Sequence, residues 1–367
     1  MVRLALYLTA VNQAPHFLSF FAVFFAHDGG EYLAFAEILQ GRVSGPLPAE
    51  VVRHDPGLAF LTVIPSILTG KFLSLPISAV LVQLICLATG LWATLRLTHH
   101  LDHSPAQRLK FGLLVALGYP ATVYYGLFHL TELPFMAFIM SSLLCFAGSR
   151  FWLAFLLAGL AAVVRSTGLL LVGSLALAHP AVLAAIRSRS PFQMETLKSL
   201  WPVAAGFLIG VLPWLLGQAG IHHFYQSTVA SHKPAFGLPF SGFVEMTSAG
   251  TIRMIYILLC VGFFLTSAAL WTRRASSAGW SHPLSNLLAT FLVLFVAFHL
   301  CLKSLYYIDR TVLTFDYQDR YLAPLWPVAL LAWRRPIPWA VVRLAIGIAI
   351  VFSAMWLRNY LHAAFAG

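Results

Sequence analysis

Residues 151–186 read FWLAFLLAGLAAVVRSTGLLLVGSLALAHPAVLAAI, and Arg165 is the only charged residue among them. This run exceeds the roughly 20 residues that one helix needs to cross a bilayer. Both flanks are basic, with Arg150 before the run and Arg187 and Arg189 after it. Because positive charge near span ends favours the cytoplasmic side, both flanks belong inside, which requires an even number of crossings. We therefore expect two short spans with a break at Arg165, near the outer membrane face.

The rest of the chain extends this pattern. Mean hydropathy is +0.83, 60% of residues are hydrophobic and only 10% are charged, which is typical of a membrane protein. No Gly/Ser- or Pro-rich linker appears, so we expect one integral, all-α polytopic domain over 1–367, with about eleven spans (range about 9 to 12). The expected spans are 4–26, 75–96, 111–128, 133–147, 152–164, 168–186, 199–218, 251–271, 285–302, 321–333 and 338–357.

Charge and cysteine usage exclude several classes of protein. The formal charge of +11 comes from short basic clusters scattered between apolar runs, not from one basic face, so nucleic-acid binding is not expected. All four cysteines lie inside apolar runs without a CxxC pair, which argues against disulfides and thiolate metal sites. No A-x-A cleavage signal follows the first apolar stretch, so we interpret it as a retained span with a cytoplasmic N-terminus.

The carboxylates are segregated in this topology. All twelve except Asp102 and Glu195 fall in segments assigned to the outer side. Three outer loops, 27–56, 219–250 and 303–320, are expected to form an active-site face, with short helices at Glu31–Leu39 and 57–70 in or after the first loop. We see no fixed-period repeat and no inverted pair of broken spans, which counts mildly against a secondary transporter.

Asp28 is the first candidate for chemistry, because it follows the first span directly and Tyr32 lies one helical turn further on. A carboxylate at the membrane surface can take a proton from an attacking hydroxyl. The alternative is structural, since Asp28-x-x-Glu31 also fits a capping box. Glu132, in Thr131-Glu132-Leu133-Pro134, is a second candidate, and its alternative role is an acid in the first turn of a helix.

The break after span 152–164 is a candidate anion site. An arginine in the membrane is costly and is a functional candidate by default, and Ser166 or Thr167 can cap the next helix, whose N-terminus favours phosphate. Alternatively, Arg165 snorkels to the headgroups or pairs with a carboxylate. Arg320-Tyr321 suits an anionic headgroup as well, although Asp319 can instead pair with Arg320.

No metal or nucleotide site is predicted. The histidines, His54 among them, form no recognised metal spacing, and no P-loop, GxGxxG or GxSxG is present. No cofactor is therefore expected, and a divalent ion near Asp28 is left open.

In the order of these motifs the sequence resembles the GT-C superfamily of polyprenyl-phosphate-sugar-dependent glycosyltransferases, most of all the PIG-V-like and bacterial mannosyltransferases. The resemblance is carried by short segments in sequence order: Asp28-x-x-x-Tyr32 with Gly41, His54-Asp55-Pro56, Thr131-Glu132-Leu133-Pro134, Arg165-Ser166-Thr167-Gly168, and Arg320-Tyr321-x-x-Pro324-x-x-Pro327. Many relatives have Asp-Glu where this chain has Asp28-Gly29, and the chain lacks a large C-terminal periplasmic domain.

This resemblance implies an inverting glycosyltransferase in a bacterial inner membrane, acting on the extracytoplasmic face. The donor is a polyprenyl-phosphate-linked sugar and the acceptor is a hydroxyl of a glycan, lipid or protein. The resemblance assigns catalysis to Asp28 and Glu132. Substrate or lipid-phosphate binding falls to Arg165, Ser166, Thr167, Arg320, Tyr321, Tyr32 and His54. A transporter or flippase of an anionic lipid or solute remains the alternative.

Overall fold

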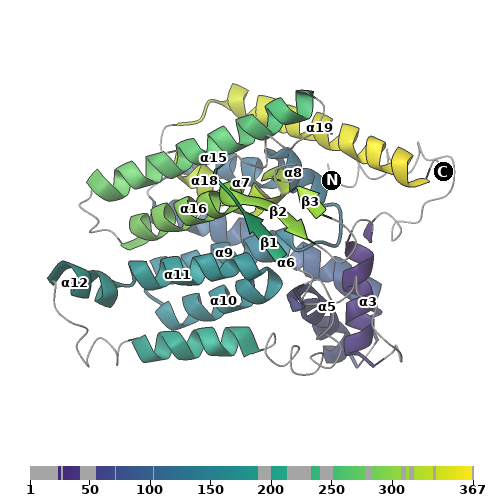
Figure 1. The fold of residues 1–367 in the computed structure, drawn as a ribbon, viewed down its shortest axis with the longest axis horizontal. Helices are drawn as coiled ribbons and strands as arrows, with labels where there is room; N and C mark the ends of the chain where they lie inside the picture. The colour runs from purple at the N-terminus through teal and green to yellow at the C-terminus, as the bar shows by residue number, and fades with distance from the viewer. Residues whose placement is uncertain are drawn as a thin grey trace. The chain divides into compact units, whose positions relative to one another are not determined.

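The computed structural model describes residues 24–25, 28–41, 55–70, 72–101, 103–188, 200–212, 233–239, 251–277, 283–306, 311–313, 318–333 and 336–365. The chain divides into two compact units. The first unit comprises 1–46, 58–137 and 335–367, and the second comprises 47–57 and 138–334. Each unit is described by itself below, and Figure 1 gives the element labels.

The described part of the chain is mainly helical, as expected. The helices that lie wholly or partly in the first unit are α3 (Gly29–Leu39), α5 (Gly57–Leu68), α6 (Leu75–His100), α7 (Pro105–Leu117), α8 (Pro120–Tyr125), α9 (Glu132–Ala147) and α19 (Trp339–Phe365). The helices of the second unit are α10 (Phe151–Val164), η1 (Ser166–Gly168), α11 (Leu169–Ala178), α12 (Pro180–Ser188), Leu200–Leu212, α15 (Thr251–Ser277), α16 (Pro283–Cys301), α17 (Gln318–Leu322), η4 (Ala323–Leu325) and α18 (Trp326–Leu331).

Four of these helices are long and apolar enough to cross a membrane. They are Leu75–His100, Arg253–Ser277, Pro283–Cys301 and Trp339–Tyr360. In three of them the most apolar window is at most 39% buried, so large apolar side chains such as Leu259 and Leu344 remain on the surface. Exposed apolar faces on long helices are typical of a chain embedded in lipid, whose hydrocarbon core they match. The count of eleven spans stays a prediction.

Helices α7, α8 and α19 pack together in the first unit. Tyr124 of α8 contacts Trp356 of α19 edge to face, with ring centroids 5.5 Å apart, and Phe128 contacts Tyr360 in the same way. The Ser353 hydroxyl donates to the carbonyl of Pro120 at 3.1 Å. Aromatic rings from both ends of the sequence therefore build one core in this unit.

The span predicted at 111–128 is not one helix. It is divided between α7 and α8, and Tyr119 between them has an extended backbone with φ −121° and ψ 119°. Pro120 causes this break, because a proline disfavours helical geometry in the preceding residue and has no N–H for the helical ladder. The span prediction gave the apolar run correctly and missed this proline.

The predicted break at Arg165 is confirmed in the second unit. Helix α10 ends at Val164, Arg165 is extended with φ −148° and ψ 125°, and the 3-10 turn η1 leads into α11. At 1.5 Å per residue, the 14 residues of α10 extend about 21 Å, short of a roughly 30 Å hydrocarbon core. The two arms that meet at Arg165 are therefore shorter than full crossings.

Small residues bring α10 and the helix Leu200–Leu212 into close contact. A Cβ at Gly159 of α10 would lie 2.8 Å from the carbonyl of Phe207 and 3.0 Å from Gly210. Gly206 and Gly210 stand four residues apart, the small-xxx-small spacing that lets helix backbones approach in membranes. Larger side chains at these positions would separate the two helices.

A small antiparallel sheet was not predicted. Strands β1 (Lys233–Phe236), β2 (Leu302–Tyr306) and β3 (Thr311–Leu313) form it in the order β1-β2-β3, with Lys233 opposite Tyr306 and Ser304 opposite Leu313. Strand β2 continues directly from the end of α16 (Figure 1). The sheet joins residues 233–236 of predicted outer loop 219–250 to residues 302–306 and 311–313 at predicted outer loop 303–320. The all-α expectation is corrected to this extent.

The segment predicted as span 321–333 is also broken. It comprises α17, η4 and α18, with Pro324 in the first turn of η4 and Pro327 in the first turn of α18. It is fixed to α15 by two indole N–H groups: Trp271 donates to the carbonyl of Val328 at 3.1 Å, and Trp333 donates to the Ser267 hydroxyl at 3.0 Å. The segment is thereby held beside α15 in the second unit.

Candidate functional site

Asp28 lies at the N-cap position of α3, as the sequence predicted, but it does not act as a side-chain cap. Its carbonyl accepts the N–H groups of Glu31 and Tyr32 at 3.1 and 3.2 Å, whereas its carboxylate makes no capping hydrogen bond. The side chain is half-buried. The sequence pattern therefore gives the position of Asp28 correctly, but its carboxylate does not cap the helix.

The start of α3 rests on His129, in the connection between α8 and α9. A Cβ at Gly29 would lie 3.2 Å from the His129 carbonyl, and the His129 N–H donates to the carbonyl of Phe24 at 2.8 Å. The ring of Tyr32 approaches the imidazole edge to face, with centroids 6.4 Å apart. Asp28 is thus placed by its neighbour Gly29, which allows close approach to this buried histidine.

The imidazole of His129 is held by two helices. Its Nε2 lies 3.1 Å from the hydroxyl of Thr62 in α5, and its Nδ1 lies 3.4 Å from the amide nitrogen of Gln83 in α6. The Thr62 hydroxyl gives its only hydrogen to the carbonyl of Leu58 at 2.8 Å, so it can only accept from the ring. Nε2 therefore carries the proton, and Nδ1 accepts from Gln83.

This arrangement keeps His129 neutral. Burial lowers the pKa of His129 to about 3, because the imidazolium would lose its hydration inside the unit. Gln83 also donates to the carbonyl of Leu130 at 2.8 Å, which fixes the chain just before Glu132. His129 consequently acts as a structural hub between α3, α5 and α6, and the geometry gives it no free ring nitrogen for proton transfer.

Glu132 begins α9, three residues after this hub. Its predicted position in the first turn of a helix is confirmed. Its side chain is 3% exposed, so the residue is buried rather than solvated. Asp28, Tyr32 and Glu132 all belong to the first unit, and His129 connects their segments. This cluster supplies one half-buried and one buried carboxylate.

In the second unit, the helix start after Arg165 is occupied by an acid from far away in the sequence. The Ser166 N–H donates to a carboxylate oxygen of Asp55 at 2.8 Å. Neither Ser166 nor Thr167 was found to cap a helix through its side chain. One N–H group at this helix start is therefore bound by a protein carboxylate, and the predicted phosphate contact of residues 165–167 stays a prediction.

Residues 55–57 pack tightly on the end of α10. A Cβ at Gly57 would lie 2.6 Å from the backbone carbonyl oxygen of Val163 and 2.6 Å from the backbone nitrogen of Val164. Only glycine fits there without displacing backbone. The His54-Asp55-Pro56 motif, with Gly57 after it, therefore has a structural use at Asp55, and His54 itself lies outside the described residues.

The guanidinium of Arg165 lies over the ring of Tyr321, with its central carbon 5.3 Å from the ring centroid. On this ring the imidazole of His299 also stacks, at 5.2 Å and an interplanar angle of 13°. Cation–π contact and ring stacking orient a planar cation without consuming its N–H groups. Two segments that the sequence predicted for phosphate binding, 165–167 and 320–321, thus meet at Arg165 and Tyr321.

Asp319 forms an ion pair with a residue that the sequence did not suggest. One carboxylate oxygen lies 3.6 Å from a guanidinium nitrogen of Arg253 in α15, and the side chain of Asp319 is fully buried while that of Arg253 is 32% exposed. Burial raises the pKa of Asp319, and the charges of Arg253 and Arg320 oppose this shift. The alternative that the sequence offered was a pair of Asp319 with Arg320, and the structure adds Arg253 as a partner of Asp319.

The predicted site residues therefore fall into two groups. Asp28, Tyr32 and Glu132 lie in the first unit, and Arg165, Ser166, Thr167, Arg320 and Tyr321 lie in the second. Among the residues that the structure describes, no group of three or more His, Cys, Asp or Glu side chains suits a metal ion.

Sequence reasoning missed three residues that shape these groups: Gln83, Arg253 and His299. Each is a polar or charged residue inside an otherwise apolar helix, which is itself a signal because burying such a group is costly unless it has a partner. The ring nitrogens of His299 have no hydrogen-bond partner among the described residues, and its side chain is 2% exposed.

Comparisons with protein-family models, with curated proteins and with solved structures find no match to this chain.

Proposed function

We propose that this protein is a membrane glycosyltransferase that moves a sugar from a polyprenyl phosphate to a hydroxyl acceptor on the extracytoplasmic face. The observation that carries the proposal is the contact of Arg165 with Tyr321 at 5.3 Å. It joins two segments 156 positions apart in the numbering, both of which resemble lipid-phosphate contacts in the GT-C superfamily. A planar guanidinium matches the geometry of a phosphate and also packs on an aromatic face.

The reaction is a single displacement. Asp28 accepts the proton of the acceptor hydroxyl, whose oxygen attacks the anomeric carbon. The bond between this carbon and the phosphate oxygen breaks, and its electron pair leaves with the polyprenyl phosphate. Arg165 stabilises the charge that develops on the leaving phosphate, and the anomeric configuration is inverted.

Two features of the first unit support Asp28 in this role. Its carboxylate is not committed to capping α3, and Gly29 and His129 fix the backbone that carries it. Because the pKa of His129 is about 3, this supporting residue is neutral at neutral pH. Glu132 is the second carboxylate of the same unit and is proposed to support the acceptor.

The direct test is incubation of the purified protein in nanodiscs with a panel of polyprenyl-phosphate sugars and hydroxyl acceptors. Release of polyprenyl phosphate is followed by mass spectrometry. For the active donor, Asp28→Asn is expected to lower the turnover number by at least about 100-fold, the usual contribution of a general base. Arg165→Met is expected to raise the donor KM roughly tenfold or more with a smaller effect on the acceptor KM.

Arg273→Met is the matched control for Arg165→Met, because Arg273 is exposed on α15 of the same unit and the charge change is identical. It should leave both KM values unchanged. Full activity of a folded Asp28→Asn variant would exclude Asp28 as the base. Movement of intact lipid or solute across the membrane, with no lipid phosphate released from any donor, would favour the transporter or flippase instead.

A further inference from the structure

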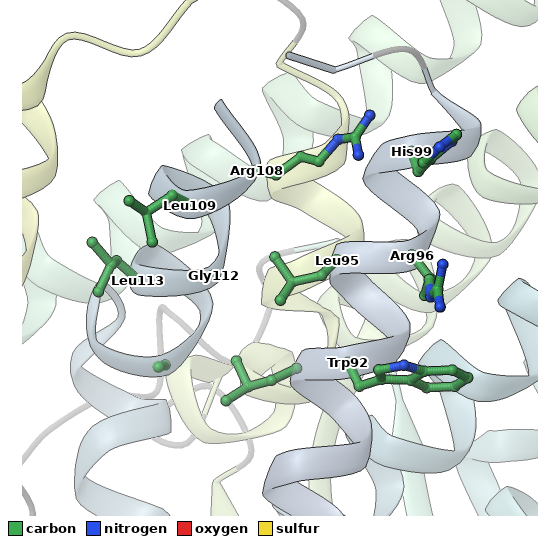
Figure 2. A pocket seen from close by; sticks show the side chains of 10 residues that line it. Trp92, Leu95, Arg96, His99, Arg108, Leu109, Gly112 and Leu113 are labelled. Carbon is green, nitrogen blue, oxygen red and sulfur yellow. The ribbon is translucent and has the colours of Figure 1, made fainter. Parts of the chain in front are cut away.

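Helices α6 and α7 of the first unit border an open groove of about 570 Å³ whose walls are almost entirely apolar. Its lining residues are Leu91, Trp92, Leu95, Arg96, His99, Arg108, Leu109, Gly112, Leu113 and Ala116. We call it the α6–α7 groove, and Figure 2 shows Leu95 of α6 pointing toward α7, the helix that carries Leu109 and Leu113. This volume lies within the range of small-molecule sites, roughly 300 to 1,000 Å³.

Cationic side chains gather at one end of this groove. Arg96 and His99 come from the last two turns of α6, and Arg108 comes from the first turn of α7. Figure 2 shows Arg108 reaching from α7 toward the part of α6 that carries His99. The Nε of Arg108 donates to the carbonyl of His103 at 2.9 Å, which fixes the side chain. This hydrogen bond does not use the two terminal nitrogens of the guanidinium.

The surroundings of this end are positive in the sequence as well. Over residues 75–131 the only carboxylate is Asp102, whereas Arg96, Arg108 and Lys110 carry three positive charges. Trp92, which is 54% exposed, lies one helical turn before Arg96 on α6, with the guanidinium 6.0 Å from its ring. A half-exposed tryptophan beside arginines at the end of an apolar helix is typical of the level of lipid headgroups.

We infer that the α6–α7 groove binds one anionic phospholipid. An acyl chain lies along Leu91, Leu95, Leu109 and Leu113, and the headgroup phosphate lies between Arg96 and Arg108. The choice of occupant rests on charge complementarity: an apolar groove on a candidate span matches hydrocarbon, and two arginines at one end match a phosphodiester with net negative charge. A neutral zwitterionic lipid would fill the groove and leave this charge uncompensated.

This inference does not depend on the proposed sugar transfer. None of the lining residues belongs to the candidate catalytic or phosphate-binding groups, which start from Asp28 and Arg165. The site is therefore a separate one, suited to a lipid that stabilises α6 and α7 in the membrane.

The experiment compares retention of two lipids with identical acyl chains. The purified full-length protein is exchanged into mixed micelles that contain dioleoyl phosphatidylglycerol or dioleoyl phosphatidylcholine, and bound lipid is counted by native mass spectrometry. One phosphatidylglycerol per chain should be retained in preference to phosphatidylcholine. Arg96→Gln and Arg108→Gln should each reduce this preference roughly fivefold, because one cation near a membrane surface contributes about that factor.

Arg343→Gln and Arg358→Gln are the matched controls, since both arginines are exposed on α19 in the same unit and lie outside the groove. They should leave the preference unchanged. Gly112→Leu tests the apolar part of the groove, which binds the acyl chain. A Cβ at this position lies 3.3 Å from the side chain of Leu95, so the new side chain occupies space in the groove. It should lower retention of both lipids while helical content and elution volume stay normal.

Three outcomes would overturn the inference. Equal retention of the two lipids by the wild-type protein would show that the groove does not select charge. An equal loss in the α19 control variants would show a general surface-charge effect. Displacement of phosphatidylglycerol by added inorganic phosphate would show that the arginines bind an anion without any contribution from the apolar walls, and it too would contradict a lipid site.

Discussion

Folding removes the carboxylate of Asp319 entirely from water, and the positive charge of Arg253 offsets the free-energy cost of this burial. Burying an ionised group costs several kcal/mol unless a partner compensates it. Arg253 reaches the pair from α15 and keeps a third of its side chain exposed, so it can stay hydrated while its charge faces Asp319. The pair therefore fixes α17, and with it Arg320 and Tyr321, to α15.

Removal of this cation is expected to make stability depend on pH. In an unfolded chain an aspartate titrates near pH 3.9, whereas burial raises the pKa of Asp319 in the folded protein. The folded state then binds the proton more tightly, so stability is present at low pH and is lost as pH rises. Arg253→Met should cost about 3 kcal/mol at neutral pH, with a lower melting temperature, and should recover part of that loss near pH 5.

The control for this prediction is the double variant Arg253→Met/Asp319→Asn. Because it removes both charges, it should be more stable at neutral pH than Arg253→Met alone and should lose the added pH dependence. Melting curves of the wild-type protein, Arg253→Met and the double variant in detergent at several pH values make the comparison. A flat pH response of Arg253→Met would mean that another group compensates the Asp319 charge.

Residue-level prediction from the sequence succeeded where spacing along one segment decides the outcome. The position of Asp28 at the start of α3 and of Glu132 at the start of α9 follows from local pattern. The partners of buried groups could not be predicted in the same way. Thr62 and Gln83 meet His129 across 67 and 46 positions, and no local rule connects residues so far apart.

At the scale of elements, the contact between residues 55–57 and the end of α10 decides how the Arg165 break is built. Asp55 accepts the Ser166 N–H, and Gly57 lies directly against the backbone of Val163. A negative charge at the start of a helix is favourable, because the first N–H groups have no partner in the helix itself. This contact therefore places Arg165 through backbone packing as well as through Tyr321.

Gly57→Ala is expected to disturb this contact. Its methyl group would lie 2.6 Å from the Val163 carbonyl oxygen, so backbone must move, at a cost of about 1 to 3 kcal/mol. Gly173→Ala is the matched control in α11, where a Cβ has nothing within 4 Å. There alanine should be neutral or stabilise the helix by up to roughly 1 kcal/mol. Thermal unfolding in detergent measures both, and equal melting temperatures would contradict the close packing at Gly57.

Element boundaries show why the sequence predicted some breaks and not others. The Arg165 break was predicted because charge and topology both required it. The break at Pro120 and the division of 318–333 into three short helices depend on prolines inside apolar runs, which hydropathy alone does not detect. The small sheet was missed because its strands come from two loops joined only in the folded chain.

At the scale of the whole molecule, composition and hydropathy were sufficient for the membrane class, and four helices have the length and apolar character to cross a bilayer. Orientation rests on charge. The segregation of carboxylates predicts that loops 219–250 and 303–320 lie on one side, and the pairing of β1 with β2 is consistent with that, because strands must lie on the same side to pair.

The orientation of α15 gives the last prediction. This helix has 27 residues, about 40 Å at 1.5 Å each, enough to cross the membrane once, and Arg273 and Arg274 near its C-terminal end favour the cytoplasmic side.

In a variant without the four native cysteines, Leu238→Cys precedes α15 on the expected outer side and Ser277→Cys ends it on the expected inner side, and both positions are exposed. A membrane-impermeant maleimide should label Leu238→Cys in intact cells and Ser277→Cys only after permeabilisation. Because both sites are exposed, the reversed pattern would invert the topology and move the proposed chemistry to the cytoplasm, whereas labelling of both from outside would mean that α15 does not cross.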